Sequence, residues 1–258
     1  MNRLEKVFEK GKAFIPFITA GDPNHAITEQ LVYRMAEAGA DLIELGIPFS
    51  DPIAEGPVIQ AADVRALEAG TTTDHIFDMV ERIRQTCEIP IAFMTYVNPV
   101  FTYGTERFME RCKRAGVDAL IVPDVPYEER EELLPYCKPN GVTLISMIAP
   151  TSMERIRIIA KEAEGFLYCV SSLGVTGTRR ELGTDAKEMI RQVKELRHIP
   201  CAVGFGIQTP EQAALVAEYA DGIIVGSAIV KLAEQYGIDC VPKVEEYVRE
   251  VIAAIDRV

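Results

Sequence analysis

The sequence has little positive charge, few histidines and no long apolar run. Its 258 residues include 27 Lys and Arg against 39 Asp and Glu. This balance leaves no overall basic footprint for nucleic acid, and it argues equally against adhesion to anionic membranes. No apolar run reaches the roughly 18 residues that a spanning helix needs, and the charged N-terminus has no apolar signal core. We therefore expect a cytoplasmic protein that binds neither nucleic acid nor membrane.

The cysteines and histidines also exclude some classes of site. None of the six cysteines falls in a CxxC pair, and their wide spacing frames no small disulfide scaffold. Cys169 and Cys201 lie inside apolar runs, where cysteine acts as a small core residue, so we expect reduced thiols in a reducing compartment. His25, His75 and His198 are not spaced as metal ligands, so we expect no metal.

Short apolar runs alternate with longer polar stretches of helical periodicity. Continuous Val, Ile and Leu runs are typical of parallel strands buried on both faces. Eight strand–helix units in about 250 residues predict a (β/α)8 TIM barrel, in the α/β class; a doubly wound open sheet uses the same units and is the alternative. The eight predicted strands span residues 14–20, 41–46, 91–97, 118–122, 142–148, 165–170, 200–204 and 222–226.

Extra helices and the domain count follow from the same pattern. No linker or composition shift divides the chain, so we expect a single TIM-barrel domain over residues 1–258. Residues 3–9 predict an N-terminal helix that covers the bottom of the barrel. Residues 57–69 predict an additional helix after the second strand, and residues 241–255 predict the last outer helix.

Glu44 is the first candidate for chemistry, because barrel active sites lie at the C-terminal ends of strands. It stands inside the second predicted strand, and glutamate is rarely buried in a strand without a partner. If Ile43 and Leu45 pack on the outer helices, alternation points Glu44 into the barrel mouth. There its pKa would be raised, which suits a general acid or base. The alternative is a structural glutamate paired with an arginine or a backbone amide.

The loop at residues 47–57 adds Asp51 and Glu55 among prolines that stiffen it. Together with Glu44 they give three acidic groups near one barrel mouth. This grouping indicates proton transfer or a metal, and the histidine pattern disfavours the metal. A solvated acidic loop is the alternative.

Glycines end the seventh and eighth predicted strands. Gly204 ends the seventh strand and Gly206 follows it; Gly226 ends the eighth strand and Ser227 follows it. Loops after these two strands commonly form a phosphate site in such barrels, because glycine lets the phosphate approach N–H groups at helix starts. Neither loop contains Lys or Arg, so binding would depend on backbone dipoles and the Ser227 hydroxyl. The alternative is that these glycines only make tight turns.

The loop after the sixth predicted strand, residues 171–185, is long, polar and rich in glycine. These features suit a mobile lid, and Gly177 would add another amide to the phosphate site; a plain surface loop is the alternative. No lysine is placed for a Schiff base inside the barrel, and no G-x-G-x-x-G follows the first strand. Carbon–carbon cleavage, isomerisation and cofactor-free proton abstraction remain.

Five segments carry a resemblance to a known family. They lie in the family's order and span nearly the whole chain, and the second is highly specific. On these segments the chain resembles the tryptophan synthase α subunit, the indole-3-glycerol phosphate lyase family. The segments are Phe14-Ile-Pro-Phe-Ile-Thr-Ala-Gly-Asp22, Glu44-Leu-Gly-Ile-Pro-Phe-Ser-Asp-Pro-Ile-Ala-Glu-Gly-Pro57, Gly174-Val-Thr-Gly177, Gly204-Phe-Gly-Ile207 and Gly226-Ser227.

The resemblance implies a lyase of tryptophan biosynthesis. Its reaction is the retro-aldol cleavage of indole-3-glycerol phosphate to indole and glyceraldehyde 3-phosphate, with neither cofactor nor metal. By position Glu44 is the acid–base residue that protonates indole C3. Glu55 stands where the family usually has an aspartate that holds the indole N–H. The same charge is thus carried on an arm one methylene longer, and we expect Glu55 to keep the role.

The resemblance also assigns the rest of the pocket. Tyr168 would support the acid–base site, and Thr176 on the lid would meet the acidic loop on closure. The indole would be walled by Phe17, Ile59, Met94, Tyr96 and Phe205. The phosphate would be held by Gly177, Gly206, Gly226 and Ser227.

The family's partner is a β subunit that consumes the indole with pyridoxal phosphate, a cofactor that belongs to that subunit. The resemblance therefore implies an α2β2 complex, with a partner surface that includes Pro48, Asp51 and residues 124–126. Three alternatives stay open at this point. The chain could be another phosphosugar barrel such as an isomerase or epimerase, a non-catalytic regulatory subunit, or a lyase that acts alone and releases free indole.

Overall fold

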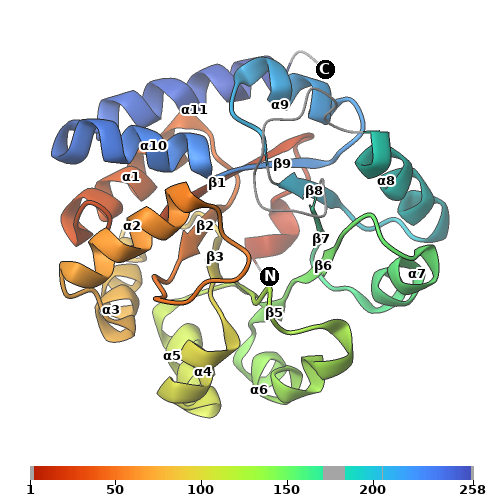
Figure 1. The fold of residues 1–258 in the computed structure, drawn as a ribbon, viewed down its shortest axis with the longest axis horizontal. Helices are drawn as coiled ribbons and strands as arrows, with labels where there is room; N and C mark the ends of the chain where they lie inside the picture. The colour runs from red at the N-terminus through yellow and green to blue at the C-terminus, as the bar shows by residue number, and fades with distance from the viewer. Residues whose placement is uncertain (1–2, 171–183, 205, 257–258) are drawn as a thin grey trace.

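Parallel strands form a ring that helices surround on the outside (Figure 1). The computed structural model describes residues 3–170, 184–204 and 206–256. The sheet order is β5-β4-β3-β2-β1-β9-β8-β7-β6, and every pair is parallel. The strands are β1 Ala13–Thr19, β2 Ile43–Gly46, β3 Ile91–Met94, β4 Ala119–Ile121, β5 Thr143–Leu144, β6 Ser146–Ile148, β7 Leu167–Val170, β8 Cys201–Gly204 and β9 Gly222–Val225.

The ring closes through the fifth predicted strand, which is divided into β5 and β6. β5 pairs with β4 and β6 pairs with β7, so one chain segment joins both ends of the sheet order. Between the two parts, the Ile145 N–H still donates to the carbonyl oxygen of Leu120 at 2.9 Å. The prediction of a (β/α)8 barrel is confirmed, and the open-sheet alternative is wrong.

The helices follow the strands as the sequence pattern predicts, with some differences at their ends. Residues 3–9 form only a short 3₁₀ helix, η1 Arg3–Lys6. The strand predicted at residues 91–97 stops at Met94, because α4 begins at Val97, whose N–H donates to Asp124. The α-helices are α1 His25–Ala38, α2 Pro57–Glu68, α3 Thr73–Ile83, α4 Val97–Tyr103, α5 Thr105–Ala115, α6 Leu134–Cys137, α7 Met153–Glu162, α8 Thr184–Leu196, α9 Pro210–Ala217, α10 Ser227–Tyr236 and α11 Val241–Ile255. The other 3₁₀ helices are η2 Tyr127–Glu132, η3 Lys138–Asn140 and η4 Gly237–Asp239.

Local capping residues set where helices begin and end. The Asn24 side chain accepts the N–H of Ile27 at the start of α1, which pairs one of the free donors of the first turn. The helix ends at Gly39 with φ 108°, a left-handed conformation that glycine adopts without strain. At α9 a capping box joins Thr209 and Gln212.

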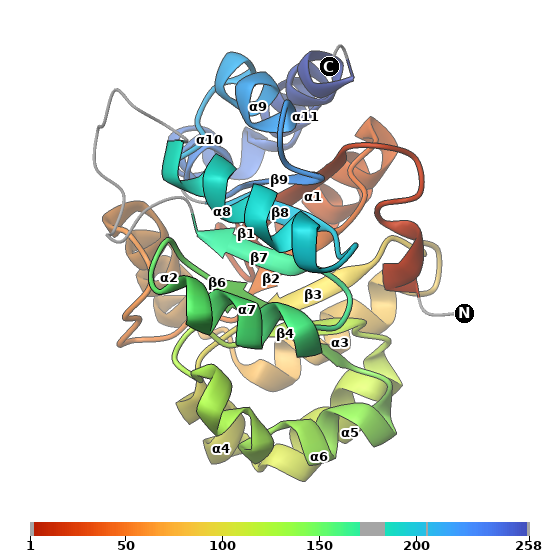
Figure 2. The same cartoon turned by 90° about the vertical axis from the view of Figure 1, so that its right-hand side faces the viewer.

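Two apolar layers make up the core. One fills the barrel interior, and the other lies between the strands and the outer helices. Leu4 and Val7, from and just after η1, belong to the interior layer, so the N-terminal segment covers the bottom of the barrel as predicted. Figure 2 shows this segment at one end of the barrel and α2 at the opposite end.

A buried carboxylate ties the elements together at the bottom. Asp118, just before β4, accepts hydrogen bonds from Arg84 at 2.9 Å, from Arg3 at 3.1 Å and from the Ile91 N–H at 2.9 Å. The Arg84 guanidinium also donates to backbone carbonyls. Since both charges of this pair are nearly buried, each depends on the other for its stability.

Candidate active site

Glu44 lies inside the barrel, on the interior face of β2. Its neighbours in register are Phe17 on β1 and Ala92 on β3, both members of the interior layer, whereas Ile43 and Leu45 pack in the outer layer. The alternation expected from the sequence is therefore confirmed. The Glu44 side chain is 1% exposed, and its Oε2 has no hydrogen-bond partner among the described residues.

The surroundings of Glu44 favour its protonated form. Burial, and secondly the negative charge of Glu55, raise the pKa of Glu44 from 4.5 to about 8. A carboxyl group with such a pKa keeps its proton at neutral pH and can donate it to a reacting atom. These surroundings therefore favour a neutral Glu44 carboxyl group over a carboxylate anion at neutral pH.

Tyr168 on β7 is the aromatic neighbour of this carboxyl group. Burial and the Glu44 charge raise the pKa of the Tyr168 hydroxyl well above its ordinary value, which places the two groups near each other in the interior. Gly204 on β8 makes room for the ring, because a Cβ at this position would lie 2.6 Å from Tyr168 Oη. The phenol therefore stays neutral and able to donate a hydrogen bond.

A second acidic group lies where the acidic loop enters α2. Glu55 is 7% exposed and Asp63, on α2, is 3% exposed. Their carboxyl groups are hydrogen-bonded to each other, and Glu55 is also hydrogen-bonded to Tyr96. Burial raises the pKa of both carboxyl groups, that of Asp63 to about 9. Because two adjacent carboxylates repel each other, the pair holds one proton between them.

Asp63 is a site residue that our sequence reasoning missed. A signal for it was present. Ile59, Ala62, Asp63 and Ala66 follow the i, i+3, i+4, i+7 spacing that marks one helix face. Ala62 and Ala66 are fully buried, so an aspartate among them had to be buried too. Such a position demands a partner or a function.

α2 is held over the barrel mouth by its own contacts. Pro57 occupies the first turn, where its missing N–H leaves no bond unmade. Arg65 forms two hydrogen bonds of 2.8 Å with Asp22, in the loop after β1, and a third of 3.1 Å with Glu234 on α10. This bidentate ion pair joins α2, the helix that carries Asp63, to the loop after β1.

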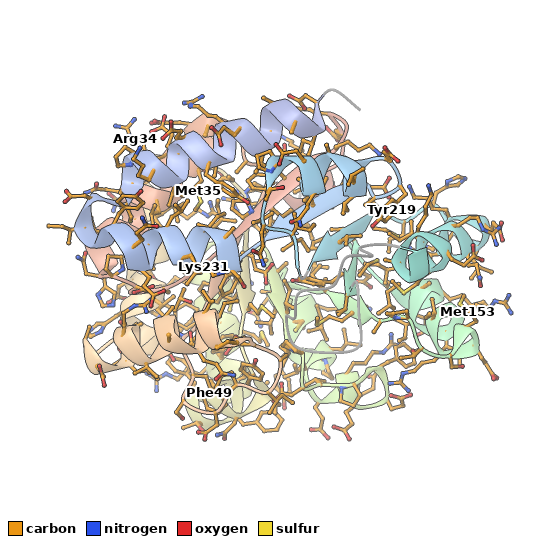
Figure 3. All side chains as sticks on the ribbon, turned by 45° about the horizontal axis from the view of Figure 1, so that its top comes forward. Arg34, Met35, Phe49, Met153, Tyr219 and Lys231 are labelled. Carbon is orange, nitrogen blue, oxygen red and sulfur yellow. The ribbon has the colours of Figure 1, made fainter. Side chains whose placement is uncertain are left out.

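The residues expected to wall an indole are brought together as far as they are described. Phe17 and Met94 are buried in the interior layer with Glu44, and Ile59 packs against it from α2. Tyr96 is buried at the start of α4, where its hydroxyl accepts the Ala54 N–H at 3.1 Å. Its ring lies 5.4 Å from that of Phe49, which Figure 3 labels in the acidic loop. Phe205 lies outside the described residues.

The residues expected to hold a phosphate lie after neighbouring strands. Gly226 follows β9 and Ser227 begins α10, so the helix N-terminus lies at the barrel mouth. Gly206 follows β8, which pairs with β9. Backbone N–H groups at such a helix start are ready donors for an anion. Thr176 and Gly177 lie outside the described residues, as does most of the expected lid.

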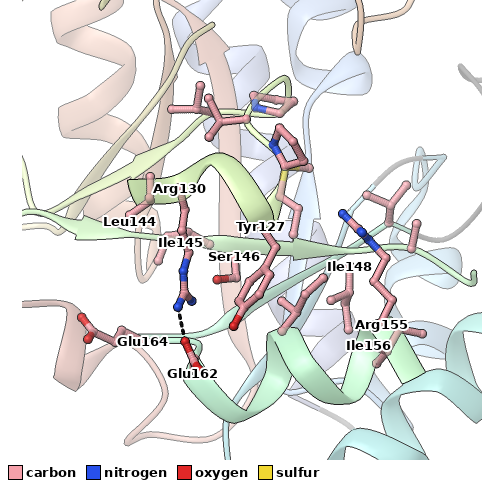
Figure 4. Close-up of a pocket in the computed structure, with 18 of the residues that line it drawn as sticks. Tyr127, Arg130, Leu144, Ile145, Ser146, Ile148, Arg155, Ile156, Glu162 and Glu164 are labelled. Atoms are coloured by element: carbon pink, nitrogen blue, oxygen red, sulfur yellow. Dashed lines mark hydrogen bonds and ion pairs between the residues drawn. The ribbon is translucent and has the colours of Figure 1, made fainter. Parts of the chain in front are cut away.

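A large cavity lies beside this site rather than around the carboxyl groups. It has a volume of about 930 Å³ and runs along β5 and β6, between η2 and α7, to Ile53 and Ala54 of the acidic loop. None of Glu44, Glu55 or Asp63 lines it. Figure 4 shows Arg130 paired with Glu162 across it, so this cationic side chain already has a partner. The carboxyl groups at the barrel mouth therefore remain the candidate active site.

The described residues contain no group of three or more His, Cys, Asp and Glu side chains placed to hold a metal ion. Within the described part of the chain, no helix combines the length and apolar character needed to cross a membrane.

The fold and the site together define a class of protein. It is a (β/α)8 barrel with buried, protonatable carboxyl groups at its mouth, an arrangement suited to acid–base chemistry. Comparison with known proteins identifies the family. The family model described as tryptophan synthase alpha chain matches residues 4–256. The chain therefore belongs to the tryptophan synthase alpha chain family, lyases of tryptophan biosynthesis that cleave indole-3-glycerol phosphate to indole and glyceraldehyde 3-phosphate.

Individual relatives agree with this assignment and confirm the resemblance drawn from the sequence. The tryptophan synthase alpha chain of Lacticaseibacillus casei is 46% identical over 99% of this chain and 96% of its own. The crystal structure of the alpha subunit from Legionella pneumophila is 40% identical with a TM-score of 0.90, and covers 100% of both chains. A chain from the tryptophan synthase complex of Pyrococcus furiosus is 35% identical with a TM-score of 0.86, and covers 94% of this chain and 98% of its own.

Proposed function

We propose that Glu44 and Glu55 carry out the cleavage of indole-3-glycerol phosphate in this chain. The observation that carries the proposal is Glu44, a fully buried carboxyl group at the mouth end of β2 whose pKa of about 8 keeps it protonated at neutral pH. Apolar side chains surround it, as a flat heteroaromatic ring requires.

The reaction begins with proton transfer from Glu44 to indole C3. Protonation makes an indolenine, so that C3 becomes a good leaving group. The Glu44 carboxylate left by this transfer then takes the proton of the adjacent glycerol hydroxyl, so the aldehyde forms, the C3–glycerol bond breaks, and its electron pair returns to the indole ring. Protons balance, since C3 gains one and the hydroxyl loses one. The products are indole and glyceraldehyde 3-phosphate.

Glu55 stabilises the positive charge that develops on the ring. Its carboxylate accepts the indole N–H, and this bond strengthens as C3 is protonated. Electrostatic stabilisation of this kind is often the largest contribution to catalysis. Phe17, Met94 and Tyr96 would position the ring, with Ile59 and Phe205 completing the wall. Tyr168 would orient Glu44 from β7.

The phosphate group anchors the other end of the substrate. The N-terminus of α10, with Gly226 and Ser227, supplies N–H donors and one hydroxyl. Gly206 and Gly177 would add backbone amides, and Thr176 would bring the lid over the acidic loop. Because this binding needs only amides and a hydroxyl, it uses no cationic side chain.

The proposed partner is a tryptophan synthase β subunit in an α2β2 complex. The relative from Pyrococcus furiosus comes from a tryptophan synthase complex. In this chain the acidic loop offers Ile53, which is 74% exposed, and the exposed Asp51, while Pro48 is buried and contributes little surface. Pyridoxal phosphate would belong to the partner, and this chain would work without a cofactor or metal. Six free cysteines, five of them buried, fit a cytoplasmic location.

The test is indole release from indole-3-glycerol phosphate by the purified chain, with and without a tryptophan synthase β subunit. We expect cleavage that rises when the partner is added. Strong cleavage that the partner does not change would indicate a lyase that acts alone. Absence of cleavage in both conditions would refute the proposal.

Glu55→Gln tests the second carboxyl group separately. The variant should lose most cleavage while still binding indolepropanol phosphate, a non-cleavable analogue, because the amide keeps the shape but not the charge. Calorimetric titration of the analogue measures binding independently of turnover. Near-normal turnover by this variant would remove Glu55 from the mechanism.

A further inference from the structure

Glu55 has a second buried carboxyl group, that of Asp63, as its neighbour. The proposed role of Glu55 does not by itself require this second group. Both carboxyl groups are nearly inaccessible, and neither has a described cation among the groups that perturb it. Among the described residues, no other N–H or O–H group donates to Glu55 Oε2 or to Asp63 Oδ2. A buried carboxyl group without a cation costs stability unless it is neutral or hydrogen-bonded. Asp63 therefore needs an explanation.

The contacts around the pair hold each member from a different side. Asp63 receives the backbone N–H of Phe49 and interacts with the Thr19 hydroxyl. Glu55 is held through its backbone, whose carbonyl accepts the Gln60 side-chain amide at 2.7 Å. At the carboxyl end, Tyr96 and Asp63 are its hydrogen-bond partners. The direction of the Glu55 side chain is thus set chiefly by these two neighbours.

We propose that Asp63 is a positioning residue for Glu55, which keeps a proton and donates it in a hydrogen bond to the Glu55 carboxylate. Glu55 is thereby held as an oriented anion at the barrel mouth. The inference rests on the proposed function, since it assumes that the Glu55 carboxylate binds the indole N–H. Asp63 itself does not touch the substrate and acts through Glu55.

The environment decides which member of the pair holds the proton. The Tyr96 oxygen already accepts the Ala54 N–H, so the phenol proton is available to Glu55 as a second donor. Asp63 is the more buried of the two, and its pKa of about 9 exceeds neutral pH. Hydrogen bonds from Asp63 and Tyr96 both act to lower the pKa of Glu55. The anion is therefore on Glu55 and the neutral acid on Asp63.

This arrangement also gives the longer side chain a physical role. Glutamate has one more rotatable bond than aspartate, so its carboxylate has more positions to lose when it is fixed. A donor on α2 selects one of these positions, and α2 is itself anchored by the Arg65–Asp22 ion pair. A displacement of about 1 Å in such a group can change a rate roughly 100-fold. Asp63 thus fixes the position of the Glu55 carboxylate, which the longer side chain by itself would leave variable.

The test compares Asp63→Asn with Asp63→Ala in the full chain bound to a β subunit. Asparagine keeps a donor, so we expect kcat within about 3-fold of the wild type. Alanine removes it, and kcat should fall roughly 10- to 100-fold while KM changes little. The acidic limb of the kcat/KM profile should also move to higher pH in Asp63→Ala, because Glu55 loses a bond that lowers its pKa. Glu68→Gln, an exposed carboxyl group on the same helix, is the matched control.

Infrared difference spectra supply a readout that does not depend on turnover. The wild type minus Asp63→Asn should show one carboxylic-acid C=O band, and its absence would overturn the inference. Wild-type kcat and an unshifted pH profile in Asp63→Ala would overturn it as well. If Asp63→Ala does not fold, the infrared difference between the wild type and the nearly isosteric Asp63→Asn still tests whether Asp63 holds the proton.

Failure of the proposed function would look different. A wild-type chain that does not cleave the substrate, or a fully active Glu55→Gln variant, would refute the catalytic roles whatever Asp63 does. In either case the band still shows whether Asp63 holds the proton. Loss of activity in Glu55→Gln together with an inert Asp63→Ala would refute only the positioning role.

Discussion

The difference in unfolding free energy between Glu44→Gln and the wild type should shift in favour of the variant as the pH rises. The reason is that the native barrel keeps the Glu44 proton when the unfolded chain has already lost it. The folded pKa is about 8, raised from 4.5 by burial. Glutamine has the same shape and never ionises, so this dependence on pH disappears in the variant.

The sign and size follow from proton linkage. Below about pH 4.5 both states of the wild type hold the proton, and the Glu44 contribution to stability is fully present. Between this pH and about 8 the unfolded state alone gives it up, so the wild type loses roughly 1.4 kcal/mol of unfolding free energy per pH unit. The full shift from 4.5 to about 8 sets an upper limit of roughly 5 kcal/mol. The loss ends above about pH 8.

The assay is urea unfolding of both proteins at pH 5, 6, 7 and 8. The difference in unfolding free energy, variant minus wild type, should grow by roughly 3 kcal/mol between pH 5 and pH 7. Other titrating groups cancel in this difference, because both proteins share them. Glu106→Gln, an exposed carboxyl group on α5, is the control and should give a difference that does not change with pH.

Parallel stability curves for Glu44→Gln and the wild type would refute the reasoning. They would mean that Glu44 is ionised in the native barrel, as a carboxylate paired with a cation would be. The proposed proton transfer to indole would then lose its acid at neutral pH. Glu44→Gln should lose its activity whether Glu44 is protonated or ionised in the native barrel, because turnover needs the carboxyl group in both cases. An activity assay of this variant therefore cannot distinguish the two states.

Three other substitutions probe separate parts of the structure. Gly204→Ala should lower kcat and the melting temperature together, because its Cβ would lie 2.6 Å from Tyr168 Oη; a change in neither would show that the ring can move away freely. Ser227→Ala should weaken calorimetric binding of indolepropanol phosphate by roughly 10- to 100-fold, the effect of about 1.5–3 kcal/mol for one hydrogen bond to a charged group, and unchanged binding would leave the phosphate to the backbone alone. Asp118→Asn should lower the unfolding free energy by about 3 kcal/mol, since it leaves the buried Arg84 without its anion; urea unfolding measures this, and a loss under about 1 kcal/mol would show that the pair contributes little.

Part of the site could be predicted because it depends on strand alternation. The position of Glu44 in β2, between Ile43 and Leu45, decides that it faces the interior once those two face the helices. The glycines after β8 and β9 could be placed for a similar reason, because parallel strands bring their carboxyl ends to one edge. These inferences use only local periodicity and the handedness of the barrel.

Other features could not be predicted, because they depend on elements far apart in the chain. The division of the fifth strand into β5 and β6 depends on register with both β4 and β7. The end of β3 at Met94 depends on Asp124, which accepts the Val97 N–H from another loop. Helix periodicity hinted that Asp63 is buried, but not that it meets Glu55 and Tyr96.

The sequence by itself determined the class of fold, the family and the face on which Glu44 lies. Each of these follows from the order of residue types along the chain, through strand alternation, helix periodicity and motif. Only the tertiary structure decided the protonation of the carboxyl groups and the pairing of Glu55 with Asp63. The physical reason is that a pKa depends on burial and on neighbouring charges, and both are set by segments that meet only when the barrel closes.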